Sequence, residues 1–150
     1  NIIVTRTFSK VYGLAAVRIG YAVTSVAMAD RLSAVNDFGE TVSLLSKAAA
    51  LAAMEDTEFV RRTVESVSTE KAHLIGQLEA MGIGYIPSHT NFLMIDLKRD
   101  SGPVRRQLEQ KKIYVSDRPR EKAWTNYMRV SLGTHEEMEV FTSVLKAILI

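Results

Sequence analysis

The chain has 150 residues, of which 47% are hydrophobic, and 19 Lys and Arg against 17 Asp and Glu leave a net charge of +2. This balance is typical of a globular chain with a buried core and argues against disorder. Because basic and acidic residues are intermixed, we do not expect a nucleic-acid partner, and no apolar run approaches the roughly 18 residues of a membrane span. The lack of cysteine excludes thiolate nucleophiles, thiolate metal ligands and disulfides, and it fits a reducing compartment, so we expect a cytoplasmic location.

The first third of the chain alternates strand-like and helix-like segments. A β-branched run at residues 2–4 predicts a fully buried strand of a parallel sheet, and residues 17–24 predict a second strand. Since the chain begins directly in the first run, without Met, we expect it to be a piece of a longer protein. Helical spacing follows at 27–35, then a loop at 36–39. Residues 41–54 predict a helix that is apolar nearly all round and therefore buried on several sides.

A long amphipathic helix is predicted between residues 57 and 82. Its apolar residues recur at helical spacing, Asp56 or Thr57 provides the N-cap, and Gly82 ends the helix. At 1.5 Å per residue, about 25 residues extend over roughly 37 Å. This length suggests a connector between two lobes.

Residues 83–150 predict an α+β module of three or four strands that contains a βαβ unit. The last helix is expected to begin at a capping box, Thr134–Glu137. One of its faces carries the apolar residues Phe141, Val144, Leu145 and Ile148. The other expected elements are, in chain order, strands 83–86 and 92–97, helix 103–112, and strands 113–115 and 127–132.

The residue with the most distinctive surroundings is Lys10, in a turn among Phe8, Tyr12 and Leu14. Burial among these side chains would disfavour the charged form and leave a free amine for Schiff-base chemistry. The alternative is an ordinary loop lysine with its ammonium group in water.

Two hydroxyls and a guanidinium accompany this lysine. Thr7 and Ser9 flank it on the N-terminal side, and Arg18 enters the next strand. Such groups suit a phosphate, because the planar guanidinium donates two parallel hydrogen bonds to an oxyanion. The alternative for Arg18 is a strand residue that extends its side chain into solvent.

Three motifs resemble those of fold-type I pyridoxal phosphate-dependent aminotransferases, most of all the histidinol-phosphate aminotransferases. They are, in family order, Arg6-Thr7-Phe8-Ser9-Lys10 with Gly13-Leu14-Ala15 and Arg18-Ile19-Gly20-Tyr21; Thr90-Asn91-Phe92; and Met128-Arg129-Val130-Ser131-Leu132-Gly133-Thr134. The resemblance implies an α/β protein, the C-terminal part of an aspartate aminotransferase-like fold. It implies the end of a large cofactor-binding domain at 1–56, a connector helix at 57–82 and a small α+β domain at 83–150.

The resemblance also implies a role for each matching residue. Lys10 matches the lysine that holds pyridoxal 5'-phosphate covalently and moves a proton between the substrate α-carbon and cofactor C4′. Thr7, Ser9 and Arg18 match residues that bind the cofactor phosphate. Arg129 matches the arginine that pairs with the substrate carboxylate, or with the phosphate of histidinol phosphate; its alternative is a strand arginine packed across the sheet.

The function implied by the resemblance is amino-group transfer with small-molecule substrates. The expected amino donor is histidinol phosphate or an aromatic amino acid, paired with 2-oxoglutarate and glutamate, and the expected assembly is a homodimer. The family's ring-stacking residue and pyridine-nitrogen carboxylate belong to an N-terminal half, so this chain alone is expected to have little activity. Two alternatives remain: a pyridoxal-binding regulatory domain of a larger protein, and a structural interaction domain that no longer binds a cofactor.

Two further features bear on the site. Ala16 stands where many relatives have a glycine before the arginine, a change that we expect the backbone to tolerate. No metal site is expected, because His73, His89 and His135 are expected to lie far apart and no carboxylate accompanies them at ligand spacing.

Overall fold

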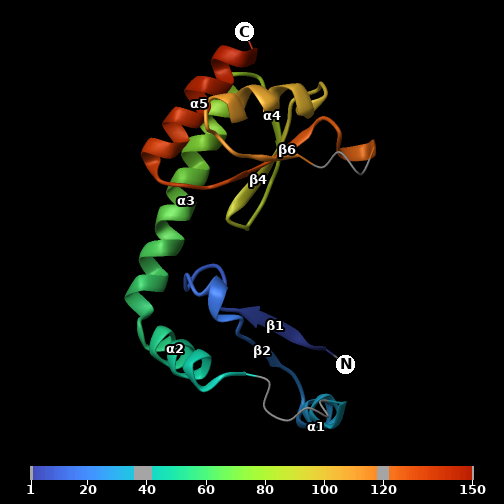
Figure 1. The fold of residues 1–150 in the computed structure, drawn as a ribbon, viewed down its shortest axis with the longest axis vertical. Helices are drawn as coiled ribbons and strands as arrows, with labels where there is room; N and C mark the ends of the chain where they lie inside the picture. Colours follow the sequence, from blue (N-terminus) through green and yellow to red (C-terminus); the bar gives the residue numbers. More distant parts are fainter. Residues whose placement is uncertain (1, 36–41, 118–121, 150) are drawn as a thin grey trace. The chain divides into compact units, whose positions relative to one another are not determined.

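The computed structural model describes residues 2–35, 42–117 and 122–149, and the predicted loop at 36–39 lies outside these ranges. The chain divides into two compact units, Asn1–Val64 and Glu65–Ile150. The division falls within the long helix α3 (Thr57–Ala80) (Figure 1). The predicted domain boundaries, after residues 56 and 82, stay predictions. Across the described ranges, no helix combines the length and the apolar character needed to cross a membrane.

The first unit is built on a two-stranded antiparallel hairpin that is followed by two helices. The register pairs Val4 with Val23 at one end of the hairpin and Thr7 with Gly20 at the other. The long loop between the strands contains a short 3-10 helix. The elements are β1 (Val4–Thr7), η1 (Ala15–Val17), β2 (Gly20–Val23), α1 (Val26–Val35) and α2 (Leu44–Glu55).

Two burial predictions for this unit are wrong. β1 is no buried strand of a parallel sheet, because it pairs antiparallel with β2 and all four of its residues are exposed. Only Ala50 of α2 is buried, whereas Leu44 and Leu45 are 80% and 83% exposed. A run of apolar residues indicates that a strand or helix forms, but burial also requires a covering layer. The described part of this unit supplies none for these faces.

The ends of α3 confirm the predicted helix signals. The Asp56 carboxylate accepts a hydrogen bond from the Phe59 backbone N–H at 2.9 Å, as expected of an N-cap. At the other end, Gly82 has a φ of +68°, and the Ile83 N–H donates to the Leu78 carbonyl at 2.9 Å. A left-handed glycine that closes the last carbonyls is a common helix end, since it has no Cβ to clash.

The second unit contains a four-stranded antiparallel sheet with the strand order β3-β4-β6-β5. Because β4 and β5 each pair antiparallel with β6, they run in the same direction, and α4 connects them. The unit is therefore a split βαβ arrangement with β6 inserted between its two parallel strands, which confirms the predicted α+β module. Its elements are β3 (Gly84–Ile86), β4 (Phe92–Asp96), α4 (Ser101–Gln110), β5 (Ser116–Asp117), η2 (Lys122–Trp124), β6 (Tyr127–Ser131) and α5 (His135–Leu149).

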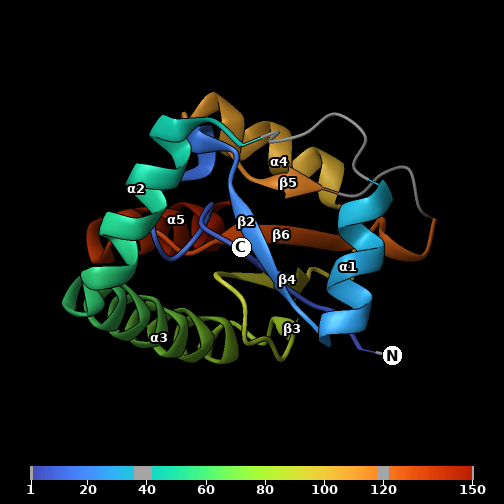
Figure 2. The ribbon, with the colours of Figure 1, turned by 90° about the horizontal axis from the view of Figure 1, so that it is seen from below.

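One face of this sheet carries the hydrophobic core. Strand residues alternate, so that Leu93 and Ile95 are buried while Phe92, Met94 and Asp96 between them are only half-buried. The C-terminal half of α3, with α4 and α5, covers the buried face (Figures 1 and 2). The buried core residues are Leu74, Leu78, Leu93, Ile95, Leu97, Val104, Leu108, Met128, Val130, Met138, Phe141 and Leu145.

The strand predicted at 113–115 is wrong in position, since the β5 ladder begins only at Ser116. Ile113 and Val115 pack against the core instead. Their apolar spacing reflects this packing and not strand pairing.

The capping box at the start of α5 is confirmed. The Thr134 N–H donates to Glu137 Oε2 at 2.8 Å, and the Glu137 N–H donates to Thr134 Oγ1 at 3.3 Å. Phe141 and Leu145, on the predicted apolar face, are buried.

Candidate active site

The hairpin of the first unit holds four of the five predicted site residues. Thr7 pairs with Gly20 at the end of the ladder, and the Phe8 N–H donates to the Ile19 carbonyl at 3.2 Å one step beyond. Ser9 and Arg18 come next on the two sides of the hairpin. The structure therefore brings Thr7, Ser9 and Arg18 to one end of the hairpin, beside the turn that contains Lys10.

Phe8 anchors this turn. Its side chain is only 3% exposed and lies with ring centroids 4.7 Å from Tyr12 and 5.8 Å from Tyr21. Its carbonyl accepts a hydrogen bond from the Leu14 N–H at 3.0 Å, which closes the turn around Lys10. The sequence interpretation gave Phe8 no role. An apolar residue between the polar Thr7 and Ser9 is the sequence signal that could have identified Phe8 as the buried residue of this turn.

The expected apolar enclosure of Lys10 is not found in the described residues, where its side chain is exposed. The neighbouring ring of Phe8 packs against Tyr12 and Tyr21 and not over the amine. The backbone nevertheless fixes the turn, because the Gly13 N–H donates to the Lys10 carbonyl at 2.9 Å and Gly13 has a φ of +69°. That conformation favours glycine.

The hydroxyl of Thr7 also shapes the turn. Thr7 Oγ1 accepts a hydrogen bond from the Ser9 N–H at 3.0 Å, a local side-chain to backbone contact two residues apart. The hydrogen of the Thr7 hydroxyl can still be donated elsewhere. Ser9 is half-buried, and Thr7 is exposed.

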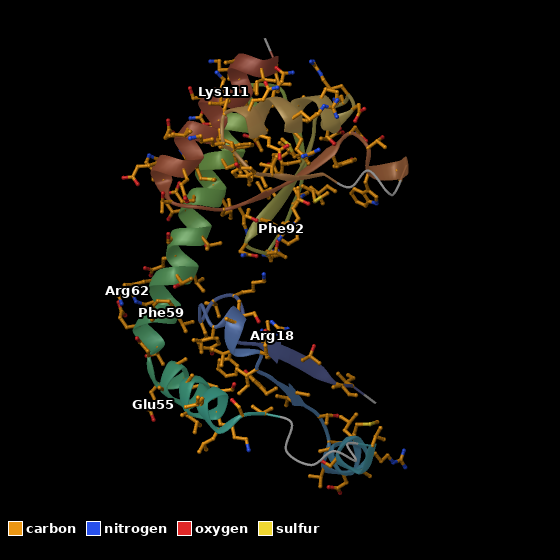
Figure 3. The ribbon with its side chains drawn as sticks, viewed as in Figure 1. Arg18, Glu55, Phe59, Arg62, Phe92 and Lys111 are labelled. Atoms are coloured by element: carbon orange, nitrogen blue, oxygen red, sulfur yellow. The ribbon has the colours of Figure 1, made fainter. Side chains whose placement is uncertain are left out.

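Arg18 follows η1 in a left-handed conformation, with a φ of 53°, which shortens the predicted strand at 17–24 to Gly20–Val23. Its Nη1 donates to the Ala15 carbonyl at 3.0 Å, while its side chain is otherwise exposed (Figure 3). This bond uses one of the five guanidinium donors. Ala16 lies inside η1 without a positive φ, so its methyl group is tolerated, as predicted.

The charge of this segment favours an anion. Residues 5–20 include Arg6, Lys10 and Arg18 and no acidic residue. Hydroxyl, guanidinium and ammonium donors are the groups that bind a phosphate dianion, and an amine beside them can react with an aldehyde. The donor set of this hairpin therefore fits a phosphorylated aldehyde such as pyridoxal phosphate.

Arg129 lies in the second unit, on β6, so the structure does not group it with the hairpin residues. The side chain is half-buried, and its guanidinium carbon lies 4.1 Å from the centroid of the Phe92 ring. Phe92 is a second residue to which the sequence interpretation gave no role, although it belongs to the motif Thr90–Phe92.

The prediction that the histidines are far apart and lack carboxylates is wrong for two of them. The rings of His73 and His135 have centroids 4.9 Å apart; His73 Nε2 lies 2.6 Å from Glu139 Oε1, and His135 Nδ1 lies 3.2 Å from Glu70 Oε2. His73 and Glu139 are in close contact without the alignment of a hydrogen bond. Helix packing brings these residues together across more than 60 positions. Within the described ranges, no group of three or more His, Cys, Asp or Glu has metal-binding geometry.

Two ionisable groups on α3 and β3 have clear pKa shifts. The Arg61 guanidinium donates to the Glu58 carboxylate at 2.6 and 2.8 Å and holds its pKa below the ordinary value of 4.5. The hydrogen bond from the Tyr85 hydroxyl to Glu79, 3.0 Å long, raises the pKa of Tyr85. Neither group belongs to the candidate site.

Comparison with known proteins agrees with this donor set. The profile of the family "Aminotransferase class I and II" matches residues 1–145. The histidinol-phosphate aminotransferase of Moorella thermoacetica is 38% identical over 149 residues, which are 99% of this chain and 38% of that protein. This chain thus spans well under half the length of that relative.

Solved structures share the fold. The histidinol-phosphate aminotransferase of Sinorhizobium meliloti, solved in complex with pyridoxal 5'-phosphate, aligns with a TM-score of 0.84 at 27% identity, over 99% of this chain and 41% of that one. The aspartate aminotransferase of Thermotoga maritima aligns with a TM-score of 0.81 at 21% identity, over 99% of this chain and 40% of that one, and this likeness supports the fold alone. The chain therefore has part of the aspartate aminotransferase-like fold and belongs to the class I and II aminotransferase family.

Proposed function

We propose that the full-length protein that carries this chain transfers amino groups with pyridoxal 5'-phosphate as its cofactor. The observation that carries the proposal is the grouping of Lys10, Thr7, Ser9 and Arg18 at one end of the hairpin, in a segment without acidic residues. Membership of the aminotransferase family supports the same reading. The regulatory-domain alternative has no specific observation in its favour.

In this proposal each hairpin residue has one task. The hydroxyls of Thr7 and Ser9 and the guanidinium of Arg18 hold the phosphate dianion, which fixes the position of the cofactor. Lys10 Nζ binds the cofactor aldehyde and, when released, accepts the proton of the substrate α-carbon. When bound, pyridoxal phosphate supplies a conjugated ring that withdraws electron density from that carbon.

We propose histidinol phosphate as the amino donor and the glutamate/2-oxoglutarate pair as the co-substrate, with an aromatic amino acid as the alternative donor. Histidinol-phosphate aminotransferases among the relatives support this choice. Arg129 would bind the phosphate of the one substrate and the carboxylate of the other, since a guanidinium fork suits both anions. A cytoplasmic homodimer is part of the same proposal.

Reduction with borohydride tests the role of Lys10. The full-length protein is incubated with pyridoxal phosphate, reduced and digested, and we expect the pyridoxyl group on the peptide that contains Lys10. Lys10→Arg should abolish this label, and Lys47→Arg, in α2 of the same unit, should retain it. An unlabelled Lys10 contradicts both the enzyme and the regulatory-domain readings.

A transfer assay tests the substrate. We expect glutamate-dependent amino transfer to imidazole acetol phosphate to exceed transfer to aromatic 2-oxo acids. Preference for the aromatic acceptors would favour the alternative donor. Labelled Lys10 without turnover of any acceptor would favour the regulatory domain.

A further inference from the structure

We propose that Phe92 is a positioning residue that orients the guanidinium of Arg129 before the anionic substrate binds. The inference rests on the proposed function, in which Arg129 binds the substrate's phosphate or carboxylate. It adds a residue that acts through Arg129 and sets how tightly the anion is held.

The strand register places the two side chains together. Phe92 pairs with Ser131 across β4 and β6, and Arg129 pairs with Met94, so Phe92 and Arg129 are diagonal neighbours on one face of the sheet. Diagonal neighbours are within reach of aromatic and long side chains. The guanidinium carbon of Arg129 lies over the Phe92 ring, 4.1 Å from its centroid.

The pair lies on the face of the sheet opposite the core. Its strand neighbours Leu93 and Val130 are buried beneath the helices, whereas Phe92 and Arg129 are each half-buried on the other face. Figure 3 shows Phe92 at the side of the sheet away from α4. A ligand can therefore approach this face without displacing the core.

The guanidinium is otherwise uncommitted. In the part of the chain that the structure describes, Arg129 forms no ion pair with a carboxylate and donates no hydrogen bond, and its ring contact with Phe92 is the interaction that holds it. A cation over a ring face interacts through its charge and leaves the N–H groups at its edge free to donate. The stack therefore restrains the side chain without using the donors that an anion needs.

The backbone of Phe92 is held in place by its neighbours. The Thr90 hydroxyl contacts both backbone groups of Phe92: it accepts from the N–H at 3.4 Å and donates to the carbonyl at 3.1 Å. Next to it, the Asn91 carbonyl accepts from the Leu132 N–H at 3.0 Å and ties this end of β4 to β6. The fixed backbone places the Phe92 ring beside Arg129, and the ring contact reduces the rotamer freedom that Arg129 loses on binding, which strengthens binding through preorganisation.

The test uses the full-length holoenzyme in its pyridoxal form, with 2-oxoglutarate as a probe that carries no amine to transfer. Calorimetry measures its dissociation constant for Phe92→Leu, for Phe92→Tyr, which keeps a ring, and for Met94→Leu, which alters the residue opposite Arg129 without removing a ring. We expect Phe92→Leu to weaken binding roughly 3- to 30-fold. Phe92→Tyr and Met94→Leu should stay within about twofold of the parent.

Kinetics add a second readout. Phe92→Leu should raise the KM for glutamate by a similar factor and leave kcat nearly unchanged. The reason is that the lost interaction stabilises the bound substrate and the transition state equally. A purely structural role would instead lower the fraction of folded, cofactor-loaded protein in Phe92→Leu and Phe92→Tyr alike. That result, or unchanged probe affinity in Phe92→Leu, overturns the inference.

A double-mutant cycle separates this inference from the proposed function. Arg129→Ala should weaken 2-oxoglutarate binding about 10- to 150-fold, as expected for a lost charge-assisted hydrogen bond. Adding Phe92→Leu to it should then have no further effect. If Arg129→Ala leaves the affinity unchanged, the proposed role of Arg129 fails. If Arg129→Ala weakens binding and Phe92→Leu acts equally in both backgrounds, only the inference fails.

Discussion

Gly20→Ala tests whether the register of the hairpin positions the candidate site. A Cβ at Gly20 would lie 2.5 Å from the backbone carbonyl oxygen of Arg6, a separation that real Cβ atoms essentially never show. The φ of Gly20 lies outside the left-handed region, so the conflict is one of contact and not of backbone strain. Because the atom in the way belongs to the backbone, no side-chain rotation relieves it.

The magnitude follows from that distance. To bring the contact to 3.0 Å, β1 and β2 must separate by about half an ångström next to the Thr7–Gly20 pair. Overpacking of this kind costs about 1–3 kcal/mol in stability. The same shift separates Thr7 from Arg18, so we also expect weaker binding of pyridoxal phosphate.

Gly76→Ala is the matched control. Gly76 lies in α3, and an added Cβ there meets no heavy atom within 4 Å. The exchange of an interior helix glycine for alanine should therefore stabilise the protein by about 0.5–1 kcal/mol. Urea denaturation and an absorbance titration with pyridoxal phosphate measure both variants in the full-length protein. Unchanged stability and unchanged cofactor affinity in Gly20→Ala would refute the steric reasoning.

Three further predictions concern packing, capping and charge. Leu145→Ala should cost about 2–5 kcal/mol, because the side chain is fully buried in the core, whereas Val140→Ala on the exposed side of the same helix should cost far less. Thr134→Ala should cost about 1 kcal/mol through loss of the α5 capping box. Glu58→Gln should destabilise the protein at neutral pH, because the lowered pKa of Glu58 stabilises the fold above the unfolded value near 4.5. This difference should vanish as pH falls through the lowered pKa.

Denaturation of the full-length variants checks these predictions, with a pH series for Glu58→Gln. Equal losses for Leu145→Ala and Val140→Ala would contradict the assignment of the core face. A Thr134→Ala variant as stable as the parent would mean that water replaces the cap without cost. A Glu58→Gln effect that grows towards acid pH would have the wrong sign for a carboxylate held by Arg61.

Local signals in the sequence predicted the helices well. Each of these signals acts within a few residues, so its effect can be predicted without the rest of the fold. They are the N-cap Asp56, the left-handed Gly82 and the capping box at Thr134. Burial is different, because it depends on neighbours distant in sequence or outside the chain. For this reason the predictions for β1 and α2 failed while the elements themselves were found.

Pairings between residues distant in the sequence were the least predictable part of the structure. The stack of Phe92 on Arg129 depends on the β4–β6 register, and the approach of His73 to His135 depends on how α3 packs against α5. Neither register nor helix packing can be derived from residue spacing alone. The exposure of Lys10 agrees with the alternative of an ordinary loop lysine, since its aromatic neighbours in sequence turned towards one another and did not enclose it.

The place of β6 in the sheet has a consequence for synthesis of the protein. β6 is the last strand along the chain, yet it is interior and separates β4 from β5. A nascent chain that ends before Tyr127 therefore exposes the edge of β4 and the apolar side chains Leu93 and Ile95. Such an open, apolar edge promotes aggregation, so the growing polypeptide is vulnerable until β6 has been synthesised and can pair with β4.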